Sequence, residues 1–186
     1  MDVHPTDSVS EIQFGMLKRP LHRNTTWDMA KYEIAAQRWI DFAQADYGGA
    51  ILNDCKYGYS TGHDFVDINL LRSTHHPDIL ADRAVHHFTY SLYPHNGGPG
   101  SLEVIHASHS LNMPLETVIL DSSQGGPASE FSLISIDADN LIIESVKQAE
   151  DNEDIIVRLY EACGRDAGAR IRFGVDIQKA FSVDLM

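Results

Sequence analysis

The chain has 186 residues, of which 43% are hydrophobic and 22% are charged, with a formal net charge of −13. This composition excludes an intrinsically disordered chain and supplies enough apolar residues for the core of one large domain or two small ones. The acidic balance argues against a nucleic-acid surface, which needs clustered basic side chains, and against binding to an anionic membrane.

The first part of the chain contains one ambiguous segment. Residues 1–10 are polar and include a proline, so we expect a poorly ordered linker or an artificial start. A short strand is predicted over residues 12–17, before Pro20 removes a ladder donor. Within residues 28–44 a set of apolar side chains falls on one helical face, which favours a helix on periodicity alone. These side chains are Met29, Tyr32, Ala36, Trp39, Ile40 and Ala43.

The middle of the chain is expected to alternate short strands with turns and loops. Strands are predicted at residues 50–52, 65–72 and 86–93 from short apolar runs and from alternation of apolar and polar side chains. The run Pro-His-Asn-Gly-Gly-Pro-Gly at 94–100 is the best internal boundary. We therefore place a first β-sandwich segment, with an incomplete sheet, at residues 11–96.

A second β-rich segment is predicted at residues 97–186. Ser101 is expected to cap a helix that runs to Leu111 and buries Val104, Ala107 and Leu111. Strands follow at residues 131–136, 141–149, 155–161 and 169–177, and a charged turn at 150–154 separates two of them. Many short strands with one helix predict a mainly β fold, an antiparallel β-sandwich with one short helix near 101–111.

No pattern for a catalytic or metal centre is present in the sequence. The chain has ten histidines, including His106 and His109 on one face of the predicted helix, but no three or four ligands occur in a zinc pattern. A Ser–His–Asp arrangement is possible in principle, yet no GxSxG elbow supports it. The glycine runs at 97–100 and 125–127 lack the phosphate-loop pattern and predict turns. We therefore assign no catalytic residue, no metal ligand and no cofactor to this chain.

The segment Asn-Asp-Cys-Lys-Tyr-Gly-Tyr at 53–59 is the best candidate for ligand contact. Asp54 and Lys56 can hydrogen-bond to hydroxyl groups, and Tyr57 offers a flat face for a sugar ring. A structural turn with a surface ion pair is the alternative interpretation, because loops with such residues are common.

Several sequence stretches in collinear order resemble a known family. They are EIQFG (11–15), RPLHRNTTWD (19–28), KYE (31–33), RW (38–39), LLRS (70–73), HHFTYSLYPH (86–95), LNMPL (111–115) and VRLYEACG (157–164). Together they resemble the C-terminal region of the family 38 glycoside hydrolases, the class II α-mannosidases, and most of all the cytosolic and bacterial branch.

The resemblance implies a β-sandwich region that follows a catalytic domain in the same polypeptide, and strands rather than a helix at 28–44. It implies a zinc-dependent retaining exo-glycosidase that removes terminal α-linked mannose from oligosaccharides through two carboxylates. The nucleophile and the zinc ligands of the family belong to the catalytic domain, which no segment here matches. Asp54, Lys56 and Tyr57 are expected to line the outer sugar-binding area of the intact enzyme.

Further expectations concern location, partners and completeness. Two cysteines without a CxxC pattern, and no signal peptide or apolar run of about 20 residues, favour the cytoplasm and no membrane contact. The chain starts where the family is mid-protein and ends at Met186, which predicts an excised fragment with a truncated C-terminus. Exposed sheet edges would then favour self-association. An independent sugar-binding module and a small free-standing hydrolase remain as alternatives.

Overall fold

A computed structural model describes residues 2–119 and 130–184. Its largest sheet has the strand order β2-β1-β4-β5-β8, and every strand pairing among the described residues is antiparallel. The five strands are β1 (Asp7–Ile12), β2 (Gly15–Pro20), β4 (Trp39–Ala43), β5 (Tyr47–Asn53) and β8 (Tyr90–Asn96).

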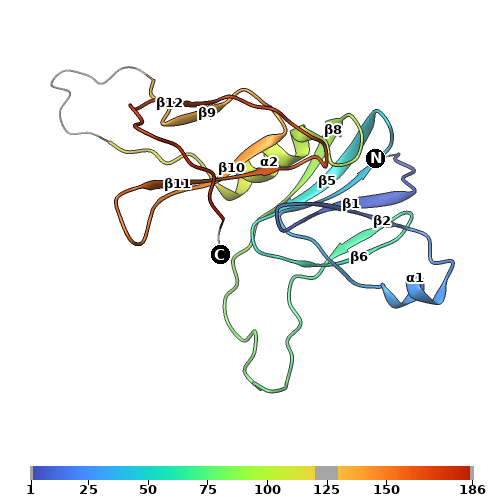
Figure 1. Cartoon of the computed structure of the whole chain (residues 1–186). Coiled ribbons are helices and arrows are strands. Elements are labelled where there is room, and N and C mark those ends of the chain that lie inside the picture. The colour runs from blue at the N-terminus through green and yellow to red at the C-terminus, as the bar shows by residue number, and fades with distance from the viewer. Residues whose placement is uncertain (1, 120–129, 185–186) are drawn as a thin grey trace.

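The smaller elements surround this sheet (Figure 1). A three-stranded sheet contains β3 (Ile34–Ala35), β6 (Gly58–Thr61) and β7 (Val66–Ile68). Two two-stranded sheets follow in the C-terminal part, one of β10 (Leu141–Gln148) and β11 (Ile155–Glu161), the other of β9 (Ile134–Ile136) and β12 (Ile171–Phe173). The helices are α1 (Thr26–Ala30) and α2 (Leu102–Asn112).

Strand β4 shows how the sequence creates two cores. Successive side chains of a strand point to opposite faces, so Trp39 and Ile40 enter different clusters. Trp39 packs with Val104 and Ile105 of α2 on one face of the main sheet. Ile40 packs with Tyr59 of β6 on the other face. The main sheet is therefore covered by α2 on one side and by the small sheet on the other.

The structure confirms the mainly β antiparallel fold and the helix behind Ser101. It also contains α1, a five-residue helix that the periodicity did not predict. Thr25 and Asp28 form a capping box that fixes its first turn, with each side chain bonded to the other residue's backbone N–H. Beyond Ala30 the helix that periodicity favours is wrong, and the strands that the resemblance implies are confirmed, because β3 and β4 occupy that range.

Other predicted boundaries also need correction. The linker predicted at 1–10 is wrong from Asp7 onward, since β1 begins there and buries Val9 between β2 and β4. The strand predicted at 12–17 is two strands joined by a turn at residues 13–14. The predicted strands at 65–72, 86–93 and 169–177 overlap β7, β8 and β12, which are shorter or shifted. The turn predicted at 125–127 lies outside the described residues.

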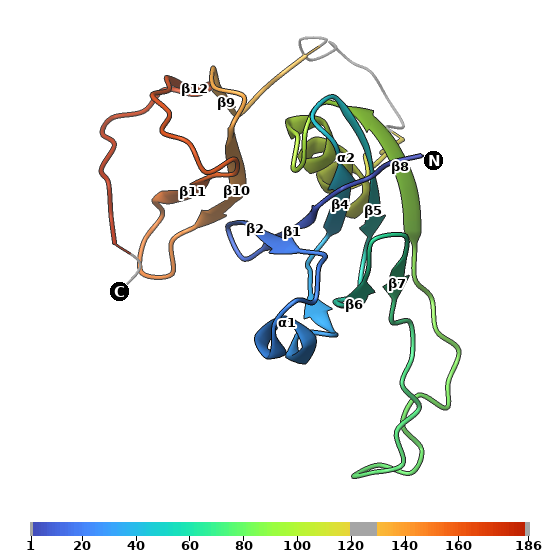
Figure 2. The ribbon, with the colours of Figure 1, turned by 90° about the vertical axis from the view of Figure 1, so that its right-hand side faces the viewer.

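The main sheet and the C-terminal strands meet on one side of the molecule. Figure 2 shows β9 to β12 beside the sheet that contains β1 and β4. Ala162, directly after β11, is buried in the same cluster as Trp39. Among the described residues, no helix is long and apolar enough to cross a membrane.

Candidate functional site

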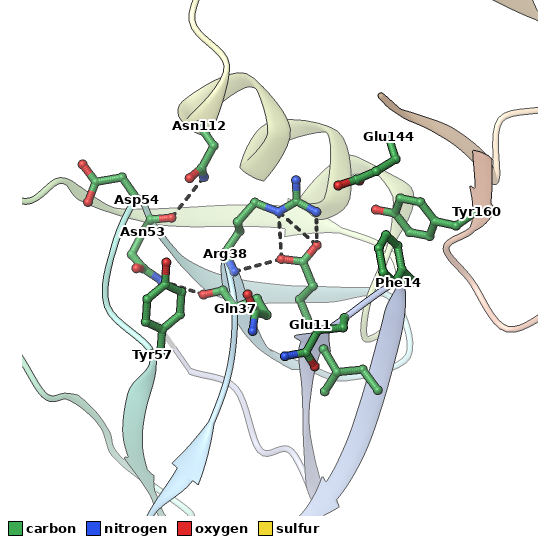
Figure 3. A pocket seen from close by; sticks show the side chains of 12 residues that line it. Glu11, Phe14, Gln37, Arg38, Asn53, Asp54, Tyr57, Asn112, Glu144 and Tyr160 are labelled. Atoms are coloured by element: carbon green, nitrogen blue, oxygen red, sulfur yellow. Dashed lines mark hydrogen bonds and ion pairs between the residues drawn. The ribbon is translucent and has the colours of Figure 1, made fainter. Parts of the chain in front are cut away.

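A cavity of about 380 Å³ lies where the main sheet, α2 and the β10–β11 hairpin meet (Figure 3). Its lining is mostly polar, with four carboxamides, three carboxylates, one guanidinium and three aromatic rings. The lining residues are Glu11, Ile12, Gln13, Phe14, Gln37, Arg38, Asn53, Asp54, Tyr57, Asn112, Glu144 and Tyr160.

An ion pair between Glu11 and Arg38 forms one wall. Pairing of Ser10 with Ile40 brings the end of β1 beside the start of β4, which places the two side chains together. The guanidinium donates from Nη2 to Glu11 Oε1 at 2.6 Å and from Nε to Oε2 at 3.0 Å, and the backbone N–H of Arg38 donates to Oε2 at 2.8 Å. The Glu11 side chain is only 5% exposed, whereas that of Arg38 is 26% exposed.

The charge of this pair is well compensated. Burial alone would lower the pKa of Arg38, but its hydrogen bonds and charge interaction with Glu11 outweigh burial and raise that pKa. Glu11 is in turn held by two groups of the same arginine. The pair is therefore a fixed structural wall, and Arg38 keeps N–H groups that Glu11 does not use.

His109 and Tyr160 extend the wall from α2 to β11. Arg38 Nη1 lies 3.3 Å from His109 Nδ1, and His109 Nε2 lies 3.3 Å from the Tyr160 hydroxyl. Arginine can only donate, so Nδ1 accepts and the ring proton sits on Nε2. Burial, and then the charge of Arg38, lower the pKa of His109, while burial raises the pKa of Tyr160. A neutral imidazole therefore links the two parts of the chain.

Asn53 holds the opposite wall. Its buried carboxamide donates to the carbonyl of Gln37 at 3.0 Å and accepts from the backbone N–H groups of Cys55 at 3.0 Å and Lys56 at 2.5 Å. This side-chain-to-backbone pattern is an Asx turn, which fixes the path of the segment that follows β5. Asn112, at the end of α2, donates to the carbonyl of Asn53 at 3.1 Å.

Two of the three predicted site residues line this cavity. Asp54 and Tyr57 do so, and Asp54 also accepts from the backbone N–H of Thr89 at 2.9 Å. A hydrogen bond with Cys55, and then the one from Thr89, lower the pKa of Asp54. Lys56 is not part of the lining, since its ammonium lies 5.0 Å from the centre of the Phe88 ring.

Sequence reasoning missed Glu11, Arg38, Asn112 and Tyr160 as site residues. Glu11 and Arg38 are 27 positions apart, and only the antiparallel pairing of β1 with β4 brings them together. A recognisable signal was available, because both lie in stretches that resemble the family.

A second polar network is closed to solvent. His95 Nε2 lies 2.9 Å from Asp41 Oδ1, and Ser101 Oγ lies 3.4 Å from His95 Nδ1. The side chains of Asp41 and His95 are completely buried, and Asp41 also accepts from the backbone N–H of Gly100 at 2.8 Å. A substrate has no access to these groups, so the arrangement fastens β4, β8 and the start of α2 rather than forming a Ser–His–Asp centre.

Comparison with known families gives the assignment. The family model described as "Glycosyl hydrolases family 38 C-terminal domain" matches residues 1–80, and the model described as "Glycosyl hydrolases family 38 C-terminal beta sandwich domain" matches residues 140–186. The chain belongs to the C-terminal part of glycosyl hydrolase family 38. The recognition made from the sequence is thereby confirmed at the level of the family, and the assignment to a cytosolic or bacterial branch stays a prediction.

Relatives named as α-mannosidases agree with that assignment, and a solved structure shares the fold. The chain is 41% identical to mouse "Alpha-mannosidase 2C1" over 95% of its length, and 34% identical to the Saccharomyces cerevisiae "Alpha-mannosidase" over 94%. It spans only 17% of each of these relatives. A crystal structure of an α-mannosidase from Enterococcus faecalis shares the fold, with a TM-score of 0.77, 15% identity, and coverage of 92% of this chain and 20% of that one.

Proposed function

We propose that this chain works as the C-terminal β-sandwich part of a longer α-mannosidase, in which its cavity helps to hold a terminal α-linked mannose. The observation that carries the proposal is the cavity wall in which Glu11 fixes Arg38 opposite Asp54 and Tyr57. Sugar sites combine hydrogen-bonding groups for hydroxyls with aromatic faces for the ring. Both kinds of group line this cavity.

Each wall has a definite part in this proposal. Arg38 offers donors to hydroxyl oxygens, since Glu11 and His109 occupy only some of its five N–H groups. Asp54 accepts from hydroxyl groups, and Tyr57 covers one face of the sugar ring. Lys56 remains a proposed contact at the outer rim, beyond the cavity lining.

The chain itself is proposed to be non-catalytic. A retaining glycosidase needs one carboxylate free to attack and one acid free to protonate the leaving oxygen. Glu11 is bound on both oxygens by Arg38 and cannot take either role. Within residues 2–119 and 130–184 no three His, Cys, Asp or Glu side chains converge to hold a metal ion. The residues described here therefore do not fit a zinc site, and the proposal places zinc and the nucleophile in the rest of the polypeptide.

The cysteines and the sheet edges support proposals about location and self-association. Cys55 and Cys163 are free thiols, which supports a cytoplasmic enzyme of the cytosolic and bacterial branch. Strands β2 and β8 are the edges of the main sheet, and unpaired edges of this kind support self-association.

An independent sugar-binding module is the second candidate, because this chain alone supplies all twelve lining residues. Turnover of an aryl α-mannoside with added zinc, measured for this chain and for the longer polypeptide, separates the two. We expect turnover only in the longer polypeptide, and a reduced kcat/KM there for Asp54→Asn. Calorimetric binding of mannose by this chain alone would favour the second candidate, and turnover by this chain alone would contradict both.

A further inference from the structure

Two protrusions carry large apolar side chains that nothing in the described chain covers. The first is α1 with the segment after it, and the second is the long connection between β7 and β8, which we call the arm (residues 69–89). Figures 1 and 2 show both projecting on the side of the small sheet that contains β6, away from α2. The side chains are Trp27, Met29 and Tyr32 at α1 and Ile79, Leu80 and Val85 on the arm, each between 61% and 83% exposed.

These side chains do not contribute to the cores. Helix α1 has no buried residue, and none of the six belongs to either hydrophobic cluster. Exposed apolar side chains of this kind mark interaction sites, because the transfer of large aromatic and aliphatic side chains out of water is favourable. Tryptophan and tyrosine are also the residues that most often anchor protein interfaces.

Polar contacts fix the shape of both protrusions without help from a core. The capping box of Thr25 and Asp28 holds α1, and Arg23 donates to the carbonyl of Thr61 at 3.1 Å, which ties the α1 region to β6. Arg72 pairs with Glu33 at 2.7 Å and joins the base of the arm to the segment after α1. On the arm, Asp82 accepts from the backbone N–H of Ser73 at 2.8 Å. The Arg72–Glu33 pair thus joins the two protrusions at their bases.

We propose that α1 and the arm form a two-part docking surface for the part of the longer polypeptide that lies outside this chain. This inference rests on the proposed function, and it deepens it by locating the contact with that partner. The chain spans only 17% of the mouse and yeast relatives. Most of such a polypeptide therefore lies outside this chain and can supply the partner for this surface. An apolar, aromatic surface suits a protein partner rather than a hydroxylated ligand, and the net charge of −13 opposes an anionic lipid surface.

Amide hydrogen exchange tests this surface directly. In this chain alone, residues 26–32 and 69–89 should exchange fast, because few buried contacts protect them. In the longer polypeptide both segments should exchange at least about tenfold more slowly, as expected for a docked interface with aromatic anchors. Residues 113–119, which carry the similarly exposed Leu115, Val118 and Ile119, should change little.

Matched variants identify the side chains responsible. Trp27→Ser with Met29→Ser and Tyr32→Ser should restore fast exchange in both protrusions of the longer polypeptide, while Leu115→Ser with Val118→Ser and Ile119→Ser should not. Unchanged exchange between the chain and the longer polypeptide would overturn the proposal. Protection in this chain alone that disappears on dilution would assign the surface to a second copy and would also overturn it. Turnover of α-mannoside is measured separately, so loss of the proposed function would not be mistaken for loss of docking.

Discussion

Two side-chain pairs lie at β4, and they differ in their access to solvent. Asp41, inside the strand, pairs with His95, and both side chains are 0% exposed. Arg38, directly before the strand, pairs with Glu11 and borders a cavity. In the first pair, Asp41 accepts from His95 and from the backbone N–H of Gly100. In the second pair, Arg38 keeps N–H donors that Glu11 does not use. The difference indicates that a buried polar pair serves stability when it is sealed, and recognition only when one partner remains accessible.

The largest effect should come from breaking the sealed pair. Asp41→Ala removes the partner of a fully buried histidine and leaves the Gly100 N–H without an acceptor. Each buried donor left without an acceptor costs about 1–3 kcal/mol, so the loss of both acceptors should lower the free energy of unfolding in urea by about 2–6 kcal/mol. Asp41→Asn keeps an acceptor of the same shape and should cost less. Equal losses of unfolding free energy for both variants would contradict the role assigned to the hydrogen bonds of Asp41.

A smaller loss is expected at the open pair. Arg38→Ala leaves the Glu11 carboxylate buried without its cation, but Arg38 is partly solvated and the cavity admits water. We expect about 2 kcal/mol in urea unfolding, the usual range for hydrogen bonds to charged groups. Adding Glu11→Gln to Arg38→Ala should recover part of this loss, because the unpaired charge is then gone. No recovery would contradict the role assigned to Glu11.

The His109 link should make stability depend on pH. The pKa of His109 lies below its ordinary value of 6.5 in the folded chain, so between these two values the unfolded chain binds more protons. The free energy of unfolding therefore rises with pH in this window and falls as the pH drops below 6.5, by at most about 1.4 kcal/mol per pH unit. His109→Gln should flatten this slope relative to the unaltered chain. An equal slope in the variant and the unaltered chain would contradict the role assigned to His109.

The smallest stability effect is expected at the mouth of the cavity. Tyr57 is 55% exposed and Tyr90, on β8, is 58% exposed. Tyr57→Ala and Tyr90→Ala should each change the free energy of unfolding by less than about 0.5 kcal/mol, as for most surface substitutions. Thermal unfolding of the two variants checks this, and a large loss for Tyr57→Ala would make that residue part of the structure rather than of a binding surface.

The parts of the fold that local chemistry determines could be predicted from the sequence. Ser101 before an apolar stripe predicted α2, and the charged turn at 150–154 separated β10 from β11. The Asn53–Tyr59 segment was recognised from its residue types, and its Asp54 and Tyr57 line the cavity. Glu11 and Arg38 could not be found in this way, because a strand register rather than a sequence spacing brings them together.

Burial explains the remaining misses. Met29 and Tyr32 suggested the apolar face of a long helix, yet Met29 is exposed within α1 and Tyr32 is exposed just after it. The real core residues of this stretch, Trp39 and Ile40, lie on opposite faces of β4. A helical period and a strand period overlap in so short a segment, and tertiary packing decides between them.

Kinetics of the longer polypeptide test the central claim most directly. With an aryl α-mannoside, Tyr57→Ala should raise KM about tenfold, the size expected for loss of one aromatic contact with the sugar ring. Tyr90→Ala, matched in residue type and exposure, should leave KM unchanged. A KM that is the same for both variants and the unaltered enzyme would contradict the assignment of the cavity to the sugar.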